Sequence, residues 1–400
     1  MELTSKKNIR FTDRFGWFWY NDEEIFHDSQ ADILRKMQVM RDQGITHVIT
    51  FSCTHFRLSY EPWWQEINVC LRKVVKAAHS LGIKVIEHHS SHLMFYPDTP
   101  AMVEHLKRDA KRRYQSLDNY PGLVEHLLDC SPEERATWQI NGLTGEPVTP
   151  YGAHGHCFNN DEYVERYLKY LETVYATGVD GIMTDDVQYY GLGQACACSV
   201  CRKKFFEATG YTLPEPGEAW QKWFGDMRNA SFNSWVHYRY NVLQNFHRRV
   251  AEHYHKLGLE LIRPNYTSGA LRCLLANMDL GELPELDVLF QECCYSSVIR
   301  YSFLSFLDEQ QQRSLLANQR KIPHMMMFYA DCNDQLLFSW AVARLAGAMF
   351  TNTPEGGKQP DEARLRKFEA LHGKYIFGLQ AQAQAGFIDS RENCAFRSQL

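Results

Sequence analysis

The sequence predicts a (β/α)8 barrel of the TIM type, an α/β fold in which eight parallel strands alternate with helices. Three observations lead to this class. Eight short apolar runs alternate with amphipathic segments, several runs are continuously apolar, and the alternation fills about 350 residues. An open doubly wound sheet is the alternative, but no G-x-G-x-x-G sequence follows the first run.

The apolar runs predict the strands. They lie at 14–20, 47–52, 84–90, 181–184, 260–264, 288–293, 324–329 and 348–352. Apolar residues at helical spacing predict helices at 29–43, 61–81, 161–177, 220–257, 303–320 and 335–346. Ser29 suits the N-cap position of the first helix. Glycines follow several of these segments, where a residue with positive φ ends a helix.

Two long insertions interrupt the alternation, after the third and fourth strands. The first, 91–160, has the composition of an elaborated loop with short helices, and the second, 187–218, contains a cysteine cluster. Loops of this length inside a compact fold are usually functional. We assign residues 1–375 to a catalytic barrel and residues 376–400 to a tail outside the barrel pattern.

Composition excludes some classes of function. The 43 Lys and Arg against 48 Asp and Glu give a net charge of −5, whereas a nucleic-acid-binding protein usually has a basic excess. No apolar run approaches the length of a membrane span, and the first residues lack the pattern of a secretory signal, so we expect a cytoplasmic protein. Aromatic residues make up 13%, which suits a ring-rich core or a sugar-binding cleft equally well.

The carboxyl ends of the strands, where TIM barrels place their chemistry, are rich in polar and aromatic residues. Asp185 and Asp186 close the fourth strand, and Glu292 lies on the sixth. Two carboxylates across a glycosidic bond are the minimum apparatus for its hydrolysis, so we expect an Asp of the fourth strand and Glu292 to form the catalytic pair. The candidates for substrate binding are Trp17, Trp19, His55, Arg57, His88, His89, Asn265, Tyr329, Asp331 and Glu355.

The cysteine cluster is the sharpest local pattern. Cys196, Cys198 and Cys201 give C-x-C-x-x-C in a polar loop, which suits tetrahedral zinc. Cys157 is the best candidate for the fourth ligand, with His156 and His154 as alternatives. A closed site of four sulfurs would be structural, because catalytic zinc keeps one coordination position open.

The segment HCFNNDEYVERYLKYL, together with CACSVC, resembles the zinc site of family 42 β-galactosidases. The resemblance implies Cys157, Cys196, Cys198 and Cys201 as zinc ligands. The family's general acid, a Glu on the fourth strand, is absent, because that position reads Thr-Asp-Asp-Val. Its nucleophile on the seventh strand is also absent, because that end reads YADCND.

A second resemblance concerns the fourth strand. VDGIMTDDVQ, followed by CACSVCRKKFFEATGYTLP, is similar to a hypothetical glycosyl hydrolase group related to α-L-fucosidases. It implies a carbohydrate substrate and Asp185 as the nucleophile, with Asp186 standing where that group has Gly. The tail GFIDSRENCAFRSQL looks like the start of the α/β domain that follows the barrel in family 42-like enzymes. The sequence is compatible with a homo-oligomer but does not predict one.

These patterns predict a retaining glycoside hydrolase in which Asp185 attacks the anomeric carbon and Glu292 protonates the leaving oxygen. Asp186 is the alternative nucleophile. A catalytically inactive, carbohydrate-binding barrel is a second interpretation, motivated by the missing family 42 glutamates. A third is a metal-dependent hydrolase that uses His88, His89 and His92 with Asp185.

Overall fold

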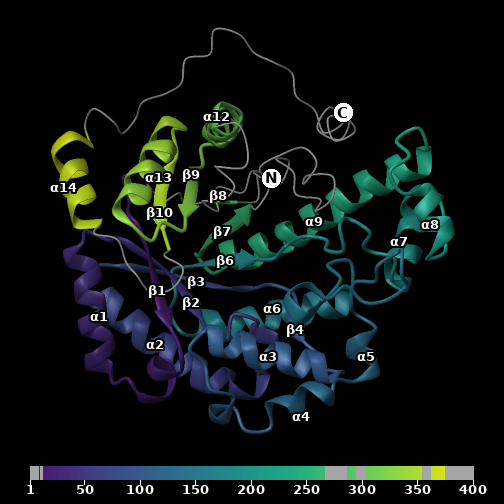
Figure 1. Ribbon diagram of the computed structural model, residues 1–400, viewed down its shortest axis with the longest axis horizontal. Helices are drawn as coiled ribbons and strands as arrows, with labels where there is room; N and C mark the ends of the chain where they lie inside the picture. The colour runs from purple at the N-terminus through teal and green to yellow at the C-terminus, as the bar shows by residue number, and fades with distance from the viewer. Residues whose placement is uncertain (1–8, 10–11, 266–285, 294–302, 354–361, 374–400) are drawn as a thin grey trace.

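The chain folds into the predicted (β/α)8 barrel (Figure 1). The computed structural model describes residues 9, 12–265, 286–293, 303–353 and 362–373. Eight parallel strands form one sheet in the order β1 (Phe15–Tyr20), β2 (His47–Ser52), β3 (Lys84–Ser90), β6 (Gly181–Asp185), β7 (Glu260–Asn265), β8 (Val288–Cys293), β9 (His324–Phe328) and β10 (Met349–Asn352). Each strand matches its predicted run to within one residue at either end. Thr351 Oγ1 of β10 donates to the carbonyl oxygen of Phe15 at 3.0 Å, which brings the last strand beside the first.

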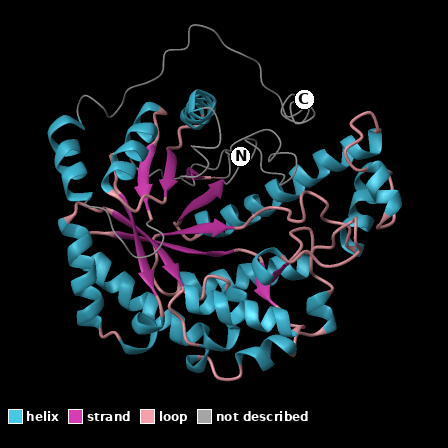
Figure 2. Cartoon of the chain, viewed as in Figure 1, coloured by secondary structure: helices cyan, strands magenta, loops and turns pink. Residues whose placement is uncertain are grey.

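Helices surround the strands (Figure 2). Those of the barrel repeat are α1 (Gln30–Asp42), α2 (Trp64–Ser80), α6 (Asp161–Tyr175), α9 (Ala230–Lys256), α12 (Phe303–Gln319), α13 (Asn333–Leu345) and α14 (Glu362–His372), and the short turns η1 (Glu23–His27) and η2 (Arg57–Trp63) precede α1 and α2. Ser29 caps α1 as predicted, accepting from the Asp32 N–H at 3.3 Å. In the described part of the chain, no helix combines the length and the apolar character that crossing a membrane requires.

The barrel interior is filled by alternate residues of the strands. Its core includes Ile49, Ile86, Met183, Phe290 and Met327, all buried. Successive side chains of a strand point to opposite faces, so every second residue continues the inward face. At the carboxyl ends these next inward positions are His88, Asp185, Glu292 and Tyr329. The interior face therefore carries the two predicted catalytic carboxylates to the same end of the barrel.

The first insertion contains a small sheet that the sequence did not predict. β4 (Leu93–Phe95) pairs antiparallel with β5 (Ala153–Gly155), so the two ends of the insertion lie together. Between them lie the short helices that were predicted: α3 (Pro100–Arg112), α4 (Leu123–Leu128), α5 (Pro132–Arg135), η3 (Leu117–Asn119) and η4 (Pro150–Gly152).

One predicted helix, which follows the second insertion, is wrong as a single helix. The segment 220–257 is broken into α8 (Glu218–Trp223) and α9, because Gly225 takes φ +86° and Asn229 caps the new helix by accepting from the Ser231 N–H at 2.9 Å. Helix α7 (Ser199–Thr209) carries the last of the clustered cysteines. In Figure 1, α7 and α8 lie at one edge of the molecule, at the far end of the long helix α9.

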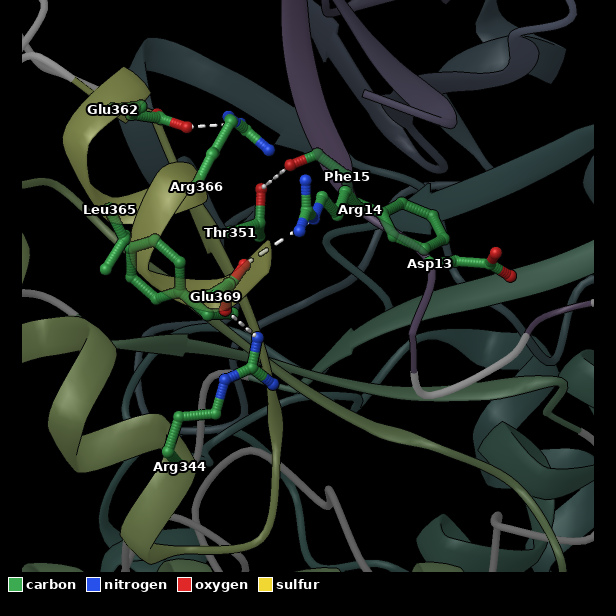
Figure 3. Close-up of a pocket in the computed structure, with 10 residues that line it drawn as sticks. Asp13, Arg14, Phe15, Arg344, Thr351, Glu362, Leu365, Arg366 and Glu369 are labelled. Atoms are coloured by element: carbon green, nitrogen blue, oxygen red, sulfur yellow. Dashed lines mark hydrogen bonds and ion pairs between the residues drawn. The ribbon is translucent and has the colours of Figure 1, made fainter. Parts of the chain in front are cut away.

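A cluster of charged residues fastens α14 to the amino ends of the strands (Figure 3). Glu369 accepts from Arg344 at 2.6 Å and from Trp340 Nε1 at 2.7 Å, and it lies 3.5 Å from Arg14 Nε. This end of a TIM barrel serves stability rather than catalysis. The predicted tail, 376–400, lies outside the described residues.

The start of β6 has no room for a side chain. A Cβ at Gly181 would lie 2.7 Å from the carbonyl oxygen of Glu260 and 2.7 Å from Ile86 Cδ1. We expect Gly181→Ala to lower the free energy of unfolding by about 1–3 kcal/mol, measured by urea denaturation, because backbone of β7 has to shift.

Gly16→Ala is the matched control on β1. A Cβ there would meet the Met40 methyl group at 2.9 Å and Ile45 Cδ1 at 3.0 Å, and both are ends of flexible side chains. Gly16→Ala should lower the free energy of unfolding by less than about 1 kcal/mol. An equal decrease in the free energy of unfolding in Gly181→Ala and Gly16→Ala would contradict the close contact between β6 and β7.

Candidate active site

Asp185 ends β6 inside the mouth of the barrel, where it is only 6% exposed. Its Oδ2 lies 2.9 Å from His88 Nε2 and 3.3 Å from His55 Nε2, and its Oδ1 accepts from the Asp186 N–H at 2.7 Å. Burial alone would raise the pKa of Asp185, but the hydrogen bonds from His55 and His88 outweigh it and hold that pKa well below its usual range. The structure thus provides a carboxylate that is ionised at neutral pH.

The two histidines come from neighbouring strands. His88 lies on the inward face of β3, and His55 follows β2. Burial lowers the pKa of His88, whereas hydrogen bonds to Asp185 and Asp186 overcome burial and raise the pKa of His55. An ionised carboxylate can only accept, so hydrogen bonds from both rings to Asp185 require a proton on each Nε2.

Asp186 takes a left-handed conformation at φ +61°, which Asp tolerates better than most residues. Its carboxylate and that of Asp185 both face His55 Nε2. Tyr190 donates its hydroxyl to Asp186 Oδ1 at 2.6 Å, and His55 Nε2 lies 3.7 Å from Asp186 Oδ2. Asp186 is therefore held by a tyrosine of the second insertion.

Glu292 occupies the inward face of β8, in register with Met327 of the barrel core. Tyr329, at the end of β9, donates its hydroxyl to Glu292 Oε1. Burial raises the pKa of Tyr151, and the charges of Asp186, Asp185 and Glu292 raise it further. The ring of Tyr151 meets the ring of Tyr190, which donates to Asp186, edge-on at a centroid distance of 6.1 Å.

Aromatic rings surround the His55–His88–Asp185 group. Trp17 meets His88 edge-on with ring centroids 5.4 Å apart. Phe51 stacks on His55 at 4.9 Å, and Trp19 lies against Phe51 at 4.4 Å. The sequence singled out both tryptophans but not Phe51, although its alternation with Ile49 along β2 identifies it as inward-facing.

Arg57 and His89 do not reach the mouth, contrary to expectation. Both contact Glu87 on the outer face of β3: Arg57 Nη2 at 3.2 Å and His89 Nδ1 at 2.6 Å. His89 Nε2 also lies 2.8 Å from the Tyr167 hydroxyl, and Arg57 donates to the Tyr20 hydroxyl at 2.7 Å. Residues 87 and 89 alternate with His88 along the strand, so they point toward the helices.

The predicted His88, His89 and His92 cluster is likewise not assembled. His92 Nδ1 lies 3.0 Å from the carbonyl oxygen of His156, on the insertion. Among the described residues, His88 groups instead with His55 and Asp185. Of the remaining candidates, Asp331 is exposed beyond β9, Asn265 ends β7 with a side chain outside the described atoms, and Glu355 lies outside the described residues.

The four predicted cysteines lie together where the end of the first insertion meets the second insertion. The Sγ atoms of Cys157, Cys196, Cys198 and Cys201 all lie within 4.8 Å of one another, and all four residues are buried. Tetrahedral zinc–thiolate bonds place sulfurs about 3.8 Å apart. His156 Nδ1 instead meets Thr137 Oγ1 at 2.6 Å, so the fourth member of the cluster is Cys157.

N–H groups point at these sulfurs. The amide of Ile140 donates to Cys196 Sγ at 3.4 Å, the amide of Cys201 donates to Cys198 Sγ at 3.4 Å, and Asn159 Nδ2 donates to Cys201 Sγ at 3.6 Å. Such donors stabilise thiolates around a metal. The donor set and its surroundings therefore fit a structural zinc ion.

No protein-family model matches the sequence, and no curated protein matches it. Solved structures match its shape. The catalytic domain of a β-amylase from Paenibacillus polymyxa matches with a TM-score of 0.58 and 11% identity, covering 91% of this chain and 99% of that one. A trehalose-6-phosphate hydrolase from Bacillus licheniformis matches with a TM-score of 0.47 and 10% identity, covering 86% of this chain and 64% of that one. The likeness to the β-amylase domain shows a shared barrel fold.

Proposed function

We propose that the protein is a retaining glycoside hydrolase whose nucleophile is Asp185 and whose proton donor is Glu292. One observation carries the proposal: the inward faces of β6 and β8 bring both carboxylates to the same end of the barrel, and two histidines keep Asp185 ionised. A glycosidase requires one ionised and one protonated carboxyl group, and in this proposal Glu292 is the one that carries the proton. The barrel shared with a β-amylase catalytic domain is compatible with this chemistry.

The residues of the site divide the reaction between them. Asp185 attacks the anomeric carbon and forms a glycosyl ester, while Glu292 transfers its proton to the leaving oxygen. Glu292 then takes a proton from a water molecule, which hydrolyses the ester and restores Asp185. Retention requires the two carboxyl groups to be about 5–5.5 Å apart, whereas a gap of about 6.5–9.5 Å would favour inversion.

We further propose that the four cysteines hold a structural zinc ion. Four thiolates leave no coordination position for a substrate, so such an ion supplies folding energy rather than catalysis. Cys157 precedes α6, whereas the other three cysteines belong to the second insertion. The ion would therefore fasten the end of the first insertion to the second.

A metal-dependent hydrolase is a second candidate, because ligand atoms of His55, His88 and Asp185 lie within 4.8 Å of one another. Two imidazoles and a carboxylate suit a divalent transition metal. A metal-bound histidine ordinarily donates its other N–H to a partner. The Nδ1 atoms of His55 and His88 are buried without one in the described part of the chain, which favours hydrogen bonding to Asp185 over metal binding.

Replacing the nucleophile should abolish turnover. We expect Asp185→Asn to lower kcat/KM on the aryl glycoside that the wild type cleaves best by roughly 10³-fold or more, with an unchanged circular dichroism spectrum. Asp42→Asn, which alters an exposed carboxylate at the end of α1, is the control and should keep full activity. Full activity in Asp185→Asn would remove this residue from the mechanism, and sugar binding by a wild type without turnover would favour an inactive barrel.

The histidine bonds predict the acid limb of the pH profile. Because these bonds lower the pKa of Asp185, activity that depends on its ionised form should persist to a pH below the ordinary carboxylate pKa. In His88→Ala the bond from His88 Nε2 is lost, so the pKa of Asp185 should rise. The acid limb of kcat/KM should then move to higher pH, and an unmoved limb would show that Asp185 does not set it.

Metal analysis separates the two metal sites. Purified protein should contain one zinc ion per chain, and Cys201→Ser should lose it and lower Tm by at least about 5 °C. Cys332→Ser, which changes an exposed cysteine, is the control. Zinc content that falls in His55→Ala and stays constant in Cys201→Ser would support the metal-dependent hydrolase instead.

A further inference from the structure

Tyr151 is an exposed aromatic residue in a costly backbone conformation. It lies in η4 at φ +54°, a region that bulky side chains rarely adopt, and the residue is 61% exposed. Its ring contacts those of Tyr190 and Phe56, yet more than half of the residue's surface stays open to solvent. Strained residues that surrounding structure holds in place are concentrated at functional sites.

The first insertion is built to hold this turn. His105 Nε2 of α3 lies 2.6 Å from the carbonyl oxygen of Tyr151, and Arg108 contacts the other ring nitrogen of His105 at 2.7 Å. Gly152, at φ +73°, permits this approach, since a Cβ there would lie 2.2 Å from the His105 ring. Pro150 begins the turn, so its conformation is restrained from both sides.

The ring of Tyr151 lies beside residues that adjoin the candidate catalytic site. It meets the Tyr190 ring edge-on at 6.1 Å, and Tyr190 in turn donates to Asp186. Its second ring neighbour, at 6.5 Å, is Phe56, which follows His55 in the chain. The electrostatic influence of Asp185, Asp186 and Glu292 on Tyr151 agrees with this placement.

We propose that Tyr151 is a platform on which a sugar ring of the substrate stacks, next to the ring whose glycosidic bond is cleaved. The inference rests on the proposed glycosidase function and adds that the substrate is an oligosaccharide longer than one unit. An exposed tyrosine face offers apolar area for the C–H face of a sugar, and its hydroxyl can hydrogen-bond to sugar hydroxyls. No sequence pattern indicated this residue, because a lone Tyr in a loop has no characteristic spacing.

Tyr114 provides a matched comparison in the same insertion. It too has a left-handed conformation, at φ +57°, and the residue is 66% exposed. Within the described part of the chain, however, its ring contacts no other aromatic ring. The two tyrosines thus share exposure and backbone strain, whereas the ring contacts with Tyr190 and Phe56 distinguish Tyr151.

The test measures binding and turnover separately. Binding of maltotetraose, cellotetraose, xylotetraose and mannotetraose is measured by titration calorimetry in the Asp185→Asn background, so that no ligand is consumed. Tyr151→Ala should raise Kd for the tetrasaccharide that binds best by about tenfold, and Tyr151→Phe and Tyr114→Ala should leave it within about twofold. With Asp185 intact, Tyr151→Ala should raise KM for that tetrasaccharide while kcat on an aryl monoglycoside is unchanged.

Failure of this inference is distinguishable from failure of the proposed function. An unchanged tetrasaccharide Kd in Tyr151→Ala, an equal loss in Tyr114→Ala, or no binding of any tetrasaccharide would overturn the platform. Tight binding that depends on Tyr151, together with a wild type that hydrolyses nothing, would support the platform and refute the hydrolase. A loss of aryl monoglycoside activity in Tyr151→Ala equal to the loss on tetrasaccharide would also overturn the platform, because the residue would then act on the cleaved ring itself.

Discussion

A buried, ionised carboxylate is the constraint on which the architecture of the site depends. Asp185 is almost completely removed from solvent, and an unpaired charge in that position would cost far more than the fold could tolerate. Donors from His55, His88 and the Asp186 amide satisfy it. The donors come from the ends of two neighbouring strands and from the turn after β6. The register of the sheet therefore determines how these donors are placed around the Asp185 carboxylate.

The two insertions add side chains to the site that the barrel strands form. The second insertion supplies Tyr190 to Asp186, and the first supplies Tyr151 to Tyr190. The backbones of the two insertions are joined by a bond from the Gly142 amide to the Gln194 carbonyl oxygen at 2.9 Å. The cysteine cluster lies beside this junction, since the Ile140 amide donates to Cys196. The cluster thus lies where the two insertions meet.

The sequence predicted the strands well, because eight short apolar runs alternate with amphipathic segments, several of which end at a glycine. The grouping of the cysteines was also predictable, because C-x-C-x-x-C places three of them close together in the chain, and zinc binding by the set stays a prediction. Side-chain direction was harder to predict. Arg57 and His89 were expected at the mouth, yet one residue of offset from His88 sends His89 to the opposite face, where Glu87 pairs with both.

Contacts that span many residues were out of reach of the sequence. The β4–β5 sheet joins residues about sixty positions apart, and Tyr151 reaches Tyr190 only because that sheet folds the insertion back. The break between α8 and α9 was missed because apolar spacing continues through Gly225. These features depend on tertiary packing, for which a single sequence carries no local pattern.

Covalent trapping tests the assignment of Asp185 most directly. An activated 2-deoxy-2-fluoro glycoside of the sugar that the protein cleaves should inactivate it, because the fluorine slows hydrolysis of the glycosyl ester more than its formation. Peptide mass spectrometry should then locate one fluoroglycosyl group on Asp185, at the end of GIMTD. A fluoroglycosyl group on Asp186 or Glu292 would contradict the account. So would hydrolysis of the corresponding glycoside without fluorine if it inverted the configuration of the anomeric carbon.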